Sequence, residues 1–70
     1  MMKGGINLND NISLKELRAR KNKTQAEVAR ELKISTQTYN SWEKNPGKIK
    51  LSNLIDLCNY FEINIGQIKV

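Results

Sequence analysis

The sequence predicts an all-α domain, a compact bundle of five short helices, and three observations predict it. A chain of 70 residues has room for one small domain. Helix-capping patterns recur along it, and apolar residues return at steps of three and four, whereas no strand-like alternation of useful length occurs. We expect residues 1–12 to form a flexible N-terminal arm and residues 13–70 to form the domain.

Two capping patterns mark the first two helices. Residues 13–16 read SLKE and residues 24–27 read TQAE. In both, a Ser or Thr precedes a Glu by three positions, so that the hydroxyl and the carboxylate can each accept a hydrogen bond from the other residue's backbone N–H. Helices should therefore begin at Leu14 and Gln25.

A third helix should begin just after Ser35, which is a suitable N-cap between the staple positions Ile34 and Tyr39. Only two residues separate the second helix from this cap. Two short helices joined by so tight a turn are typical of a helix-turn-helix. The third helix should place Tyr39 and Trp42 on its apolar side.

The C-terminal third predicts two further helices. One begins near residue 51 and carries an apolar stripe that we expect to support the core, namely Leu51, Leu54, Ile55, Cys58 and Phe61. Asn64 can cap a last short turn, which Gly66 weakens by about 1 kcal/mol relative to Ala.

Composition limits the classes of function. The net charge is +5, and residues 15–50 hold ten Lys or Arg against four Glu. A nucleic acid or an anionic membrane surface is the expected partner, unless the charges only solvate helix faces. With no His and a single cysteine, Cys58, the chain offers no Cys/His zinc site, Ser–His triad or disulfide framework. We expect no enzyme activity, metal, cofactor or small-molecule ligand.

Hydropathy predicts no membrane association. The longest apolar run is far shorter than the roughly 20 residues that span a bilayer, and Gly, Asn and Asp occupy the place of a signal peptide's apolar stretch. No helix combines a basic face with the large apolar face that interfacial insertion requires. We expect a cytoplasmic protein.

Four stretches of the sequence resemble the phage repressor and Cro superfamily of helix-turn-helix proteins, often called XRE-type. They are LKELR at 14–18, TQAEVA at 24–29, ISTQTYNSWE at 34–43 and LIDLCNYFEIN at 54–64. The resemblance covers about four fifths of the chain. It implies a lambda-repressor-like fold with the helix-turn-helix at the second and third helices, and double-stranded DNA as the partner.

The resemblance also implies that the third helix lies in the DNA major groove. Gln37 is the leading candidate for a base contact, since a Gln amide can pair with adenine N6 and N7. Thr36 and Ser41 occupy base-reading positions of the family, and Asn40 is placed to reach a base or a flanking phosphate. The alternative is that these four polar residues only keep an exposed helix soluble.

Phosphate contacts are expected at two places. Gln25 lies in the first turn of the second helix, where free N–H groups and the helix dipole favour an anion, and Thr24 can assist if its hydroxyl is not used up as the cap. Around the end of the third helix, two or three of four further residues should contact phosphates: Lys44, Asn45, Lys48 and Lys50.

Other positions are assigned structural roles. The family commonly pairs the positions of Arg18 and Glu43 in an ion pair between the first and third helices. Family members usually have Gly where this chain has Lys33, and often near Glu62, because these helix ends favour a left-handed residue. We expect non-glycine residues there to cost about 1 kcal/mol each.

Taken together, these features predict a sequence-specific transcriptional regulator, a repressor that binds a two-fold symmetric operator as a homodimer, with half-sites about 34 Å apart. Candidates for the dimer interface are Ile63, Ile65, Ile68 and Val70, although Ile63 and Ile68 can instead close the core. Two alternatives remain: an antitoxin-like or restriction-control regulator with a protein partner, and a protein-interaction module without sequence-specific DNA binding.

Overall fold

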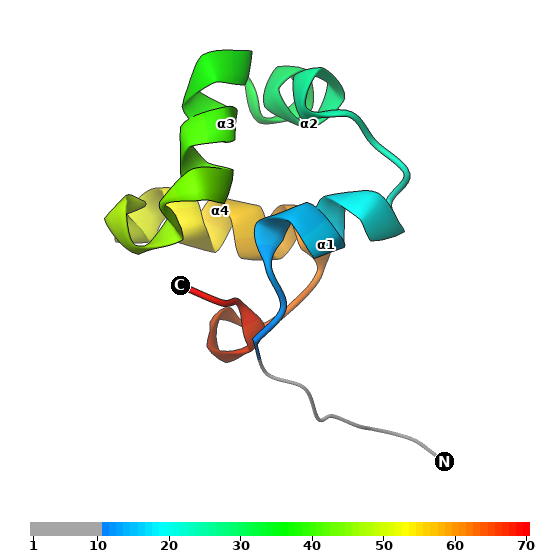
Figure 1. Ribbon diagram of the computed structural model, residues 1–70. Helices are drawn as coiled ribbons and strands as arrows, with labels where there is room; N and C mark the ends of the chain where they lie inside the picture. The colour runs from blue at the N-terminus through cyan, green and yellow to red at the C-terminus, as the bar shows by residue number, and fades with distance from the viewer. Residues whose placement is uncertain (1–10) are drawn as a thin grey trace.

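The computed structural model describes residues 11–70 and has the all-α architecture that the sequence predicts (Figure 1). Four α-helices and two short 3-10 helices follow one another, with no strand among the described residues: α1 (Leu14–Arg20), α2 (Gln25–Leu32), α3 (Thr36–Lys44), η2 (Pro46–Lys48), α4 (Leu51–Phe61) and η3 (Ile65–Gln67). The prediction of five helices is approximately right, because the fifth is the 3-10 turn η3.

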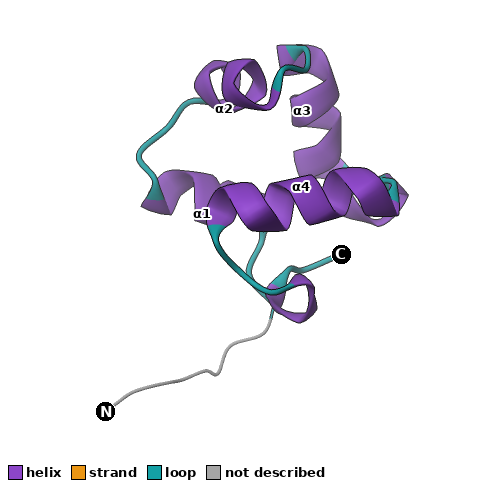
Figure 2. Cartoon of the chain, turned by 180° about the vertical axis from the view of Figure 1, so that it is seen from behind, coloured by secondary structure: helices purple, strands orange, loops and turns teal. Residues whose placement is uncertain are grey.

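Both views show how the helices are arranged. α2 lies on one side of the molecule and α1 and α4 on the other, α3 runs from beside α2 to α4, and η3 lies beyond α1 and α4 next to the start of the described chain (Figures 1 and 2). Within residues 11–70, no helix is both long and apolar enough to cross a membrane.

Side-chain caps fix the starts of the first three helices. The Ser13 hydroxyl accepts a hydrogen bond from Glu16 N at 3.1 Å, and the Ser35 hydroxyl accepts one from the Thr38 backbone at 3.0 Å. At α2 the capping box is complete, since Thr24 Oγ1 accepts from Glu27 N at 3.1 Å while Glu27 Oε1 accepts from Thr24 N at 2.8 Å. These local bonds explain why the helix starts could be predicted.

Two helix ends have the backbone conformation expected from the resemblance. Lys33 ends α2 with φ 61° and ψ 42°, and Glu62 ends α4 with φ 58° and ψ 48°. Both are left-handed, a region in which a Cβ atom crowds the backbone. At Lys33 and Glu62 glycine would therefore relieve strain, whereas Asn22, with φ 60° after α1, is of a residue type that tolerates this region.

The core is formed by all four α-helices and by residues from both ends of the described chain. Tyr39, Leu57 and Val28 are its largest fully buried side chains. The prediction that Leu51 and Ile55 support the core is wrong, since they are 64% and 46% exposed. The reason is that only one side of α4 faces the core. This side is centred on Leu57, and the apolar stripe is wider than the side that is buried.

The two ends of the domain are held together by Ile12 and Ile68, which form an isolated parallel β-bridge. Ile12 N donates to Gln67 O at 2.9 Å, and Lys69 N donates to Ile12 O at 2.9 Å. Both isoleucines are buried, so Ile12 belongs to the domain and not to the predicted arm. The rest of that arm, residues 1–10, lies outside the described residues. Ile68 is likewise a core residue rather than an exposed candidate for a dimer interface.

Candidate nucleic-acid interface

Helix α3 has one apolar and one polar side. Tyr39 is fully buried, and Trp42 packs against the core with its ring edge-on to Tyr39, 6.4 Å between centroids. The opposite side carries neutral hydrogen-bonding side chains as far as Ser41, and the exposed Lys44 stands at its C-terminal end. Three of the predicted base contacts, Thr36, Gln37 and Ser41, are exposed there.

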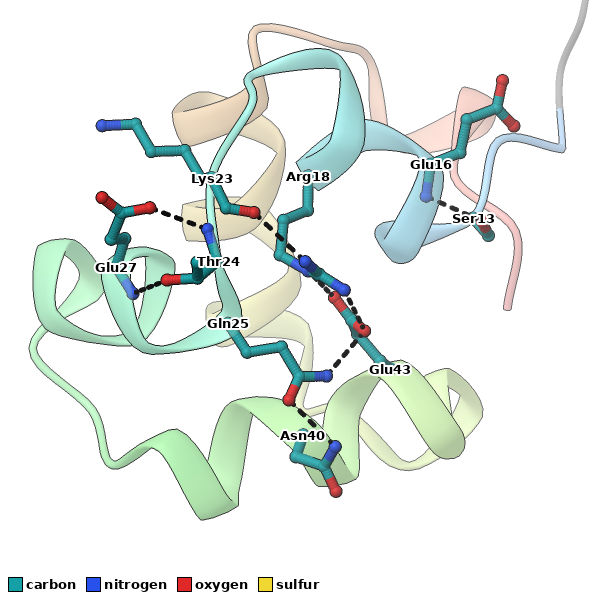
Figure 3. Close-up of polar contacts among 9 residues, drawn as sticks. All are labelled: Ser13, Glu16, Arg18, Lys23, Thr24, Gln25, Glu27, Asn40 and Glu43. Carbon is teal, nitrogen blue, oxygen red and sulfur yellow. Dashed lines mark hydrogen bonds and ion pairs between the residues drawn. The ribbon is translucent and has the colours of Figure 1, made fainter.

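Arg18 and Glu43 form the ion pair that the resemblance implies, between α1 and α3 (Figure 3). Arg18 Nε donates to Glu43 Oε2 at 2.6 Å and Nη2 donates to Oε1 at 3.2 Å. A third donor, Nη1, bonds the backbone oxygen of Lys23 at 3.1 Å. The side chains are only 18% and 8% exposed, so solvent screens this pair weakly.

Gln25 and Asn40 extend this pair into a four-residue network, an arrangement that the sequence did not indicate. Gln25 Nε2 donates to Glu43 Oε1 at 2.8 Å, and Asn40 Nδ2 donates to Gln25 Oε1 at 3.1 Å (Figure 3). Both residues are half-buried. Gln25, which is predicted to contact a phosphate, thus binds Asn40, which is predicted to contact a base, across the α2–α3 junction.

The network keeps its charged groups ionised. Burial alone would raise the pKa of Glu43, but hydrogen bonds from Arg18 and Gln25 outweigh it and lower that pKa. The hydrogen bond to Glu43 correspondingly raises the pKa of Arg18. Burial raises the pKa of Tyr39, and the nearby charge of Glu43 adds to this effect, but the Tyr39 hydroxyl has no hydrogen-bond partner of good geometry within residues 11–70.

Residues 44–50, which comprise the last residue of α3 and the segment after it, are basic and largely exposed. None of their three lysines forms an ion pair within the described residues, and Asn45 beside them is exposed as well; the lysines are Lys44, Lys48 and Lys50. Ile49, buried between two of them, anchors the segment to the core. The four predicted phosphate contacts among residues 44–50 are therefore held at the end of α3 and just after it.

Two other basic residues are engaged elsewhere. Lys23 Nζ pairs with Glu31 Oε2 at 2.8 Å, and Lys21 Nζ lies 4.9 Å from the centre of the Tyr60 ring. Tyr60 in turn donates to Glu31 Oε1 at 2.5 Å, which joins α4 to α2. No sequence pattern indicated these contacts, because they join residues brought together only by packing.

Comparisons with known proteins agree with this architecture. Residues 14–68 match the profile of the helix-turn-helix family, whereas no curated protein and no solved structure matches the chain. The matched region contains the α2–α3 pair, the polar side of α3 and the basic segment. The chain belongs to the XRE-type, Cro/C1-like helix-turn-helix family of DNA-binding transcription regulators.

Proposed function

We propose that the protein is a cytoplasmic repressor that binds a two-fold symmetric operator as a homodimer, with α3 of each subunit in the major groove. One observation carries the proposal: the exposed side of α3 is neutral and hydrogen-bonding from Thr36 to Ser41, and three lysines with no ion pair among the described residues stand at the end of the helix and just after it. Neutral donors and acceptors suit base edges, and free cations beside them suit phosphates.

Base reading is assigned to the polar side of α3. Gln37 is exposed and makes no hydrogen bond within the described residues, so both ends of its amide are available for adenine N6 and N7. Thr36 and Ser41 can bond several bases through their hydroxyls. Asn40 completes the set one turn along the helix.

Phosphate binding is assigned to both ends of the motif. Gln25 is the first residue of α2, and one of its two amide hydrogens remains for a phosphate after the bond to Glu43. Thr24 beside it accepts the capping bond and can still donate its hydroxyl hydrogen. Lys44, Lys48 and Lys50, with Asn45, would bind the phosphates that follow.

A homodimer would cover apolar side chains that the monomer leaves in water. Val70 and Ile65 are 68% and 47% exposed, and Leu51 and Ile55 on α4 are exposed as well. We infer that a second subunit covers these side chains. Ile63 packs against the core and contributes less.

The experiment that tests this function is selection of bound duplexes from a random DNA library, at fixed near-physiological salt and with excess competitor. Titration of the selected duplex and of a scrambled duplex follows. A two-fold symmetric site preferred by about a thousandfold supports the proposal. Equal, salt-sensitive binding to both duplexes would overturn operator reading and direct attention to a protein partner.

A further inference from the structure

We propose that Asn40 reads the exocyclic amino group of an adenine or a cytosine, because a chain of hydrogen bonds that begins at Arg18 fixes which end of the Asn40 amide faces outward. The inference rests on the proposed function, namely on α3 lying in the major groove. It goes further by assigning one residue the class of base that it accepts.

The orientation of each amide follows from the charge at the start of the chain. Glu43, paired with Arg18, is a carboxylate and can only accept hydrogen bonds. Gln25 lies 2.8 Å from it and must therefore present its NH₂ group, which turns its carbonyl oxygen toward Asn40. At 3.1 Å from that oxygen, Asn40 must present its own NH₂ group. The reverse orientation of either amide would bring two oxygens together.

The consequence is that Asn40 Oδ1 faces away from the network, as Figure 3 shows. No hydrogen bond within residues 11–70 ends on this oxygen. Asn40 Nδ2 keeps one free hydrogen after its bond to Gln25, but the Oδ1 end that faces outward is repelled by phosphate, which carries only acceptors, and suits a base. It accepts from adenine N6 or cytosine N4, and it is repelled by guanine O6 and thymine O4.

Asn40 therefore differs from Gln37, whose unrestrained amide can turn either end toward a base. Each base pair exposes one amino group in the major groove, on one strand or the other. A fixed acceptor consequently selects which strand of the pair carries the amino base. At the position facing Asn40, adenine and cytosine should be preferred and guanine and thymine disfavoured.

The test starts from the duplex selected for the wild-type protein and replaces each base of one half-site in turn by the other three. The wild type should show a position at which A and C bind on the order of threefold to tenfold better than G and T. Asn40→Ala should abolish this preference and leave those at other positions intact. Asn59→Ala, which removes an exposed Asn from α4, is the matched control and should change nothing.

Gln25→Met tests the positioning chain, since it removes the link to Asn40 and leaves the Arg18–Glu43 pair in place. The affinity of this variant for DNA should fall by the same factor for all duplexes, because a phosphate donor is removed. Its preference for A or C should disappear only at the base position that faces Asn40. Circular dichroism confirms that each variant folds. An unchanged preference in either variant, or a preference for G or T, overturns the inference while leaving operator reading standing. Absence of any preferred duplex for the wild type overturns the proposed function itself.

Discussion

Arg18 and Glu43 join α1 to α3 through a two-pronged ion pair, with Arg18 Nε 2.6 Å and Nη2 3.2 Å from the carboxylate oxygens. Glu43 also accepts from Gln25, so one carboxylate ties the first three helices together. Through Gln25 the pair is linked to Asn40, one of the residues assigned to base reading. Stability and the orientation of the reading helix therefore depend on the same contact.

Removing one partner of this buried pair should lower the free energy of unfolding more than breaking an exposed pair does. Glu43→Ala leaves Arg18 largely buried without its carboxylate, and we expect a loss of about 2–3 kcal/mol in the free energy of unfolding. Arg18→Ala should cost a similar amount. Glu16→Ala breaks the exposed Glu16–Arg20 pair, with side chains 52% and 57% exposed, and should cost less than about 0.5 kcal/mol. Urea denaturation measures all three, and equal losses would contradict the structural role of the buried pair.

Acid should destabilise the protein through its carboxylates. The pKa of Glu43 is lowered in the folded state, as are those of Glu27, through bonds from Thr24, and Glu31, through bonds from Lys23 and Tyr60. A lowered folded pKa contributes stability that is present above the unfolded value, about 4.3 for Glu, and lost as the pH falls through the folded value. The free energy of unfolding should fall below about pH 5.

A variant separates the share of Glu43 in this acid dependence. Glu43→Gln cannot titrate at this position, so its unfolding free energy should depend less steeply on pH than that of the wild type between about pH 5 and 2. Denaturation series in urea at several pH values give both profiles. Parallel profiles would mean that Glu43 titrates alike in the folded and unfolded chains.

Relaxing a left-handed helix end should stabilise the fold. Lys33 has φ 61° and is exposed, so Lys33→Gly removes the strain of a Cβ atom without opening a cavity. We expect a gain of about 1 kcal/mol, which corresponds to roughly 4–8 °C in Tm for a domain of this size. Lys33→Ala loses the same charge but keeps the Cβ, and its Tm should stay near that of the wild type. A higher Tm in both variants would show that the loss of the charge, and not the relief of strain, stabilises the fold.

Local patterns explain how much of this structure could be predicted. The helix starts depend on bonds between residues three apart, such as Thr24 and Glu27, and these are visible in the sequence. The Gln25–Asn40 bond joins residues 15 apart, and only the packing of α2 on α3 brings them together. The exposure of Leu51 could not be predicted, because an apolar stripe does not show which of its edges a neighbouring helix covers.

Salt dependence gives a direct measure of the phosphate contacts assigned to residues 44–50, at the end of α3 and just after it. Removing one phosphate contact should lower the slope of log affinity against log salt by about 0.9. Replacing Lys44, Lys48 and Lys50 singly by Gln should therefore reduce the slope by nearly two for a contacting residue in a dimer, because the substitution acts in both subunits. Lys15→Gln, which removes an exposed charge from α1, should leave the slope unchanged. A reduction near one would indicate one bound subunit, and equal slopes for all four variants would remove residues 44–50 from the interface.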